Sequence, residues 1–139
     1  MKGNIIIIIS FIILGCKSAE EQRLQDVSMI EVIANPKRFH KKHIQVQGYF
    51  TNETKGTAIY FSKSDFQNMI YKNAIFIYIS NEDMKRYNLP PSQGYVTLIG
   101  IYNKDKKGTY NFYSGGFDKI LNIERMYKKD GVNDEYNPE

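Results

Sequence analysis

The sequence predicts a mainly β domain, a barrel of five to six strands, with a short helix before the first strand and another between strands three and four. Three observations predict this fold class. Apolar residues recur at every second position in several short runs, turn-forming residues separate these runs, and helical patterns are confined to brief segments. Two of the runs also hold an interior glycine, which is typical of strands that coil sharply to close a barrel.

The first element is a short helix that begins after Ser28. This serine is a suitable N-cap, and Glu31 stands three residues later, in the position of a capping box. Asn35 should end the helix, because a residue that precedes proline is pushed out of the helical region. Phe39 then serves as an apolar anchor for the turn into the first strand.

The first strand begins at His43, where the apolar period changes to two. One face carries Ile44, Val46, Gly48 and Phe50, and the other carries His43, Gln45, Gln47 and Tyr49. Residues 52–56 form a turn, and residues 57–62 return as the second strand. This pattern predicts a hairpin whose first strand is half buried.

The remaining elements follow in the same way. Residues 63–72 form a polar link with one or two helical turns, and residues 74–79 form the third strand. Asn81 caps a helix over 82–87, which residues 88–91 end. Residues 95–102 form a fourth strand, residues 109–113 a fifth hairpin arm, and residues 117–127 a continuation after a break at Ser114-Gly115-Gly116.

An internal repeat supports the two hairpins. Four residues recur at a spacing of 52, as the pairs Gly48 and Gly100, Gly56 and Gly108, Thr57 and Thr109, and Ser62 and Ser114. Both copies contain an apolar strand with a glycine, a charged turn that ends in Lys-Gly-Thr, and an aromatic return strand. The repeat predicts that both glycines lie where another part of the chain approaches closely.

This order of elements resembles the oligonucleotide/oligosaccharide-binding (OB) fold, a five-stranded barrel with a helix between strands three and four. The segments Asn35-Pro36-Lys37-Arg38-Phe39 and Lys42-His43-Ile44-Gln45-Val46-Gln47-Gly48-Tyr49 also look like the opening of small secreted bacterial OB-like domains. The resemblance covers residues 27–127. The alternative architecture is a meander sandwich with helical decoration.

The N-terminus has the layout of a secretory signal. An apolar run extends from Ile5 to Leu14 and rises about 15 Å as a helix, which is about half of a hydrocarbon core. Ile13-Leu14-Gly15-Cys16 resembles the lipobox of bacterial lipoproteins, and this resemblance implies a lipid such as palmitate on Cys16. The alternative is an ordinary signal peptide.

The lipobox also sets the expected domain boundaries. They are a signal peptide over 1–15, a flexible tether over 16–26, the barrel over 27–127 and a disordered tail over 128–139. Lipidation would place the protein in the cell envelope, on the periplasmic side of the outer membrane or on the cell surface, with the membrane as its first partner.

Composition and motifs argue against several function classes. The formal net charge of +4 is far below that of a domain with a concentrated basic stripe, so nucleic acid is not the expected partner. With its single cysteine lipidated, the chain has no thiol for a disulfide or zinc site. His40 and His43 flank two lysines and lack an acidic neighbour, so we expect a solvated strand entry. We therefore expect no catalytic residue, cofactor or metal site.

A binding function has more support, because eleven tyrosines and eight phenylalanines exceed the needs of a core of this size. The outward sides of the first three strands form a candidate ligand face of aromatic, amide and lysine side chains. This predicted face comprises Gln45, Gln47, Tyr49, Tyr60, Phe76, Tyr78, Lys42 and Lys63. The expected ligand is an envelope protein or a glycan, and the alternative function is a nucleic-acid-binding OB module. The opposing interpretation is that these tyrosines are simply barrel wall.

Overall fold

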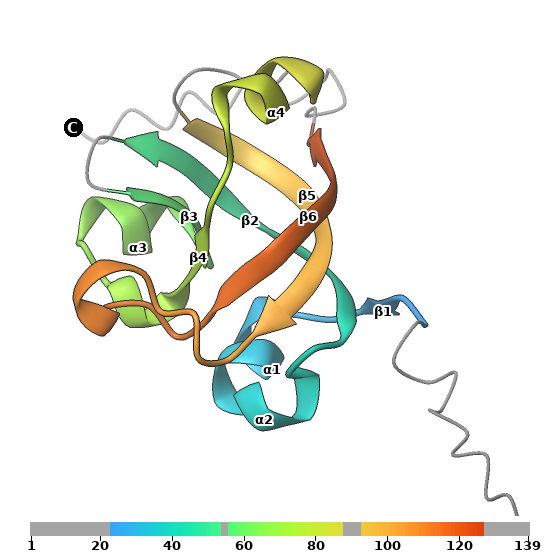
Figure 1. The fold of residues 1–139 in the computed structure, drawn as a ribbon. Helices are drawn as coiled ribbons and strands as arrows, with labels where there is room; N and C mark the ends of the chain where they lie inside the picture. The colour runs from blue at the N-terminus through green and yellow to red at the C-terminus, as the bar shows by residue number, and fades with distance from the viewer. Residues whose placement is uncertain (1–22, 54–55, 88–92, 127–139) are drawn as a thin grey trace, which may run out of the picture.

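The computed structural model describes residues 23–53, 56–87 and 93–126 (Figure 1). Several sequence-based predictions lie outside the described residues. They are the signal peptide over 1–15, the lipid attachment at Cys16, the tether up to residue 22, the helix-ending segment 88–91 and the tail over 128–139.

The described chain forms six strands, four short α-helices and further single helical turns. The strands are β1 (Gln25–Asp26), β2 (His43–Glu53), β3 (Gly56–Tyr60), β4 (Ala74–Ile77), β5 (Gln93–Asn103) and β6 (Gly116–Arg125). The helices are α1 (Met29–Ala34), α2 (Pro36–Phe39), α3 (Lys63–Gln67) and α4 (Asn81–Arg86), and the 3-10 turns include η2 (Tyr71–Asn73) and η3 (Thr109–Asn111).

Five of these strands close into a barrel, and β1 is added to its side. The strand order is β1-β2-β3-β4-β6-β5, and β2 also pairs with β5. All barrel neighbours are antiparallel except β4 and β6, which run parallel and pair at Phe76 and Gly116. With α4 between the third and fourth barrel strands, this is an OB-like barrel, and the sandwich alternative is wrong.

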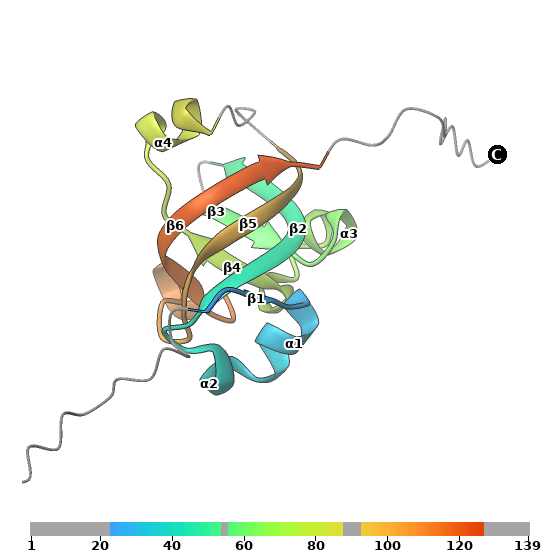
Figure 2. The ribbon, with the colours of Figure 1, turned by 90° about the vertical axis from the view of Figure 1, so that its right-hand side faces the viewer.

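The barrel closes because β2 is long enough to serve two neighbours. Its residues 43–51 pair with β5, and its residues 49–53 pair with β3. Ile44, Val46 and Phe50 point inward and are fully buried, as their spacing predicts. Helix α4 covers one end of the barrel, and α1 and α2 lie at the other end (Figures 1 and 2).

The N-terminal helix begins where the sequence predicts. The Ser28 side chain accepts a hydrogen bond of 3.2 Å from the backbone N–H of Glu31. Asn35 ends α1, and Pro36 then begins α2, because proline is tolerated in a first helical turn. Phe39 is fully buried, which confirms its role as an anchor.

Several predicted boundaries shift by one or two residues, and at two places the assignment itself differs. Gln25–Asp26, which the sequence assigns to the tether, forms β1 and pairs in parallel with Ile44 and Gln45 of β2. Two residues are too few for an apolar period to reveal them. Helix α4 is capped by Ser80 and not by Asn81, since the Ser80 hydroxyl and the Asp83 carboxylate form a complete capping box.

The predicted strand over 109–113 is wrong. Residues 109–111 form η3, in which Tyr110 and Asn111 have φ values of 64° and 56°, in the left-handed region that no strand allows. Strand β5 instead pairs directly with β6, and residues 104–115 form a long loop between them.

The repeat therefore holds in part. A Cβ at Gly48 would lie 2.5 Å from the carbonyl oxygen of Tyr60, and one at Gly100 would lie 2.6 Å from that of Lys119. Both strand glycines thus mark close approaches, as predicted. The two copies of the repeat differ from Gly108 onward, because Gly56 begins a strand whereas Gly108 lies in the β5–β6 loop.

Candidate functional site

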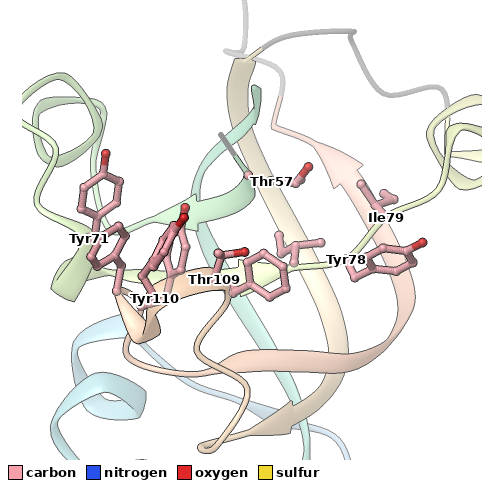
Figure 3. A pocket seen from close by; sticks show the side chains of 11 residues that line it. Thr57, Tyr71, Tyr78, Ile79, Thr109 and Tyr110 are labelled. Atoms are coloured by element: carbon pink, nitrogen blue, oxygen red, sulfur yellow. The ribbon is translucent and has the colours of Figure 1, made fainter. Parts of the chain in front are cut away.

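A cavity opens on the barrel wall formed by β3 and β4, beneath the β5–β6 loop (Figure 3). Its volume is about 520 Å³, within the usual range of roughly 300–1,000 Å³ for a ligand site. The lining comes from four segments: the start of β3, the end of β4 with the two residues after it, η2, and the β5–β6 loop. These residues are Gly56, Thr57, Tyr71, Phe76, Ile77, Tyr78, Ile79, Thr109, Tyr110, Phe112 and Tyr113.

Aromatic rings form most of the wall of this cavity. Tyr71 and Phe112 stack with ring centroids 5.4 Å apart and planes 19° apart. Tyr113 meets Tyr71 edge-on at 5.8 Å and contacts Phe76 at 5.6 Å. These contacts hold the rings in fixed orientations, which lowers the entropy cost of binding a ligand against them.

Two tyrosines extend from the rim into solvent. Tyr78 is 75% exposed and Tyr110 is 80% exposed, an unusual degree for large rings. Figure 3 shows Tyr110 on the β5–β6 loop and Tyr78 beyond the end of β4, on either side of Thr109. Exposed aromatic side chains grouped around a cavity are characteristic of a binding surface.

The backbone of the β5–β6 loop is strained at Tyr110. Left-handed backbone costs a tyrosine roughly 1–2 kcal/mol, and Tyr110 adopts it, whereas the neighbouring Asn111 is of a type that tolerates this conformation. The Lys72 ammonium group donates to the carbonyl of Asn111 at 3.3 Å, and the Ser114 hydroxyl donates to the carbonyl of Lys72. Such strain is typical of ligand-contacting segments.

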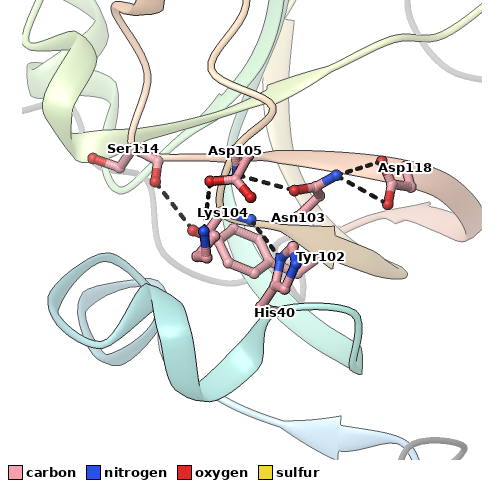
Figure 4. A network of polar contacts seen from close by, with 7 residues as sticks. All are labelled: His40, Tyr102, Asn103, Lys104, Asp105, Ser114 and Asp118. Carbon is pink, nitrogen blue, oxygen red and sulfur yellow. Dashed lines mark hydrogen bonds and ion pairs between the residues drawn. The ribbon is translucent and has the colours of Figure 1, made fainter.

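A polar network fixes the base of the same loop (Figure 4). The Asn103 amide donates to the two carboxylate oxygens of Asp118 at 2.9 and 3.2 Å, and its own oxygen accepts from the backbone N–H of Asp105 at 2.9 Å. The backbone N–H of Lys104 donates to Nδ1 of His40 at 3.3 Å. The start of the loop is thus tied to β6 and to α2.

Tyr102 links this network to the far end of the loop. Its ring is fully buried, and its hydroxyl donates to the carbonyl of Ser114 at 3.1 Å. Burial, and then the negative charge of Asp105, raise the pKa of Tyr102 to about 12. The hydroxyl therefore stays protonated and remains a donor through neutral pH.

The predicted ligand face is brought together only in part. Phe76 and Tyr78 line the cavity, as a binding face requires. Tyr49 and Tyr60 are buried instead, with exposed fractions of 6% and 3%, because Phe66 of α3 packs on them at 5.8 and 5.4 Å. The prediction that both rings face outward into solvent is therefore wrong, although Tyr60 still borders a second, smaller cavity beside this one.

The polar members of the predicted face also lie away from the cavity. Gln45 pairs with β1 and β5, and Gln47 borders a separate hollow with Phe61 and residues 26–29. Lys42 precedes β2, and Lys63 is exposed at the start of α3. None of these four side chains lines the aromatic cavity.

Sequence reasoning missed Tyr71, Tyr110, Phe112 and Tyr113. Three of them belong to the segment Thr109–Tyr113, which was assigned to a strand. The available signal was the closely spaced aromatic run between Gly108 and Gly115, since a loop of that composition has no core to fill.

The described residues contain no group of three or more His, Cys, Asp or Glu side chains placed to hold a metal ion. Among the same residues, no helix has the length and apolar character needed to cross a bilayer.

Comparisons of the chain with protein-family models, with curated proteins and with solved structures give no match.

Proposed function

We propose that this chain is a non-catalytic binding module of the bacterial cell envelope, held to the membrane through lipid on Cys16, which binds a neutral glycan in the aromatic cavity. The lipid anchor is supported by the Ile13-Leu14-Gly15-Cys16 motif. The binding role is supported by the position of the cavity. OB barrels use the second and third barrel strands together with the loop between the fourth and fifth, and here these are β3, β4 and residues 104–115.

One observation carries the choice of ligand: none of the described residues that line the cavity is charged. A phosphate backbone or an acidic glycan needs cations within contact distance. A neutral sugar needs only rings for its C–H faces and hydroxyl groups for its hydroxyls. Tyr78 and Tyr110 offer the rings, and Thr57 and Thr109 offer hydroxyl groups.

Replacing Tyr78 or Tyr110 by alanine is expected to weaken binding of an N-acetylglucosamine tetramer by about tenfold, because each ring supplies on the order of 1–3 kcal/mol of stacking. Isothermal calorimetry measures the affinity. Both rings are mostly exposed, so the free energy of unfolding should change little. Tyr95→Ala is the control, since Tyr95 is a tyrosine with 46% of its surface exposed that does not line the cavity.

Affinity that is the same for wild type, Y78A and Y110A would contradict the glycan site. Crosslinking in the native cell provides a second readout. Capture of an envelope protein that depends on Tyr78, with no glycan binding, would favour the protein partner and reject the sugar.

Nucleic acid is the alternative ligand, and one observation favours it. Lys104, Lys106 and Lys107 lie on the same loop as the rings, and aromatic platforms beside cations bind single strands. These lysines do not line the cavity, so we rank this function second. It requires oligonucleotide affinity that falls steeply as salt is raised.

The lipid anchor has its own test. A Cys16→Ser variant should lose all labelling by a metabolically supplied fatty acid and should leave the membrane fraction, because its only thiol is gone. Membrane fractionation with fatty-acid labelling measures both effects. A Ser18→Ala variant is the control, and equal labelling of C16S and wild type would reject the anchor.

A further inference from the structure

A second cavity lies beside the aromatic one, next to α3 and η2. Its volume is about 250 Å³, and its lining is Thr51, Gly56, Tyr60, Phe66, Gln67, Met69, Tyr71 and Tyr113. Three of these residues, Gly56, Tyr71 and Tyr113, also line the first cavity. The two spaces therefore share a wall.

The size of the second cavity indicates how it is used. Ligand sites that function alone have volumes of roughly 300–1,000 Å³, and this cavity falls below that range. The larger cavity falls within it. The smaller space is thus better explained as an extension of the neighbouring site than as a site for a separate molecule.

The chemistry of the lining is the same in both cavities. The second contains hydroxyl groups, the Gln67 amide and aromatic rings, and none of its described lining residues is charged. Met69 stands at its edge with 64% of its surface exposed and with φ at 54°, a second strained position beside the site. Both cavities thus favour a neutral ligand that combines apolar faces with hydroxyl groups.

We infer that the ligand is a linear neutral oligosaccharide that occupies both cavities, with one end between Tyr78 and Tyr110 and the other beneath Gln67 and Met69. Tyr71 lines both subsites and contacts the middle of the oligosaccharide. This inference rests on the proposed glycan-binding function and adds a second subsite, in which β2 and α3 contribute lining residues beside those of β3, η2 and the β5–β6 loop. A monosaccharide would fill the first subsite only.

The test is the dependence of affinity on chain length. Calorimetry would compare N-acetylglucosamine with its dimer, trimer and tetramer on the folded domain. For wild type we expect the tetramer to bind on the order of tenfold tighter than the monosaccharide, because the longer chain gains a second set of contacts without a second cost of association.

Variants separate the two subsites. The double variant Q67A/M69A should keep the affinity for the monosaccharide and lose most of the gain with length. Tyr78→Ala should weaken binding of all lengths by a similar factor. Lys63→Ala is the matched control, since Lys63 is exposed on the same helix as Gln67 and lines neither cavity.

The outcomes are distinguishable. If wild type binds the monosaccharide and the tetramer equally well, or if Q67A/M69A retains the full gain with length, the second subsite is wrong and the glycan function stands. If wild type binds no sugar of any length, the proposed function fails and the subsite fails with it. Thermal unfolding of each variant shows whether the fold is retained.

Discussion

Gly48→Ala is expected to lower the free energy of unfolding by about 3 kcal/mol, because β2 has no room for a methyl group at this position. The added Cβ would lie 2.5 Å from the carbonyl oxygen of Tyr60, 2.6 Å from the sulfur of Met29 and 2.8 Å from a side-chain carbon of Ile59. Methionine can rotate away, but the carbonyl belongs to the neighbouring strand. Backbone must therefore shift, and overpacking of this kind costs roughly 1–3 kcal/mol or more.

Chemical denaturation of wild type and G48A measures this effect. Gln47→Ala is the matched control, because Gln47 is the preceding residue of the same strand and is exposed, so its change should stay within about 0.5 kcal/mol. A G48A protein as stable as the control would mean that β2 and β3 approach less closely than described.

The second large effect is a loss of stability in alkali that depends on Tyr102. Its pKa is raised from 10 to about 12 in the folded state, first by burial and then by Asp105. A raised pKa contributes stability that is fully present below pH 10 and is lost as the pH rises towards 12. A shift of this size corresponds to about 2–3 kcal/mol.

Tyr102→Phe removes the titrating group, so its free energy of unfolding should fall less between pH 9 and pH 12 than that of wild type. All other ionisable groups are the same in both proteins, so they cancel in the comparison. At neutral pH the variant should be less stable by about 1 kcal/mol, since the carbonyl of Ser114 loses its donor. Identical pH profiles would show that the Tyr102 hydroxyl is not buried.

Much of the barrel could be predicted because one face of each strand follows a simple rule. In β2, alternation alone identifies Ile44, Val46 and Phe50 as core, and Ser28 marks the start of α1 by its capping chemistry. These signals are local, so they do not depend on knowing which strands are neighbours.

The outer face could not be predicted in the same way. Tyr49 and Tyr60 alternate correctly with the core, yet both are buried because α3 folds back over them. That contact joins segments whose proximity no periodicity reveals. The β5–β6 loop was not predicted for another reason, since Tyr110 adopts a left-handed backbone conformation that tyrosine rarely takes.

The candidate site contains residues that a local sequence pattern predicts and residues that only tertiary contacts bring together. Phe76 and Tyr78 were identified because they belong to a regular strand and its immediate continuation. Tyr71 and Phe112 were missed because they meet only when η2 and the β5–β6 loop come together, with Lys72 and Ser114 as the link.

Among the described residues, the parallel pairing of β4 with β6 is the shortest strand pairing of the barrel. Within the described residues it consists of the Phe76–Gly116 pair, supported by hydrogen bonds from the amides of Phe76 and Ser114 at 2.8 and 3.0 Å. A short strand pairing opens locally more easily than a long one. These two amides should therefore exchange with deuterium sooner than those of β2. The aromatic cavity is lined by β4 and by the β5–β6 loop that leads into β6, so a bound ligand should hold this loop against β4 and slow the exchange.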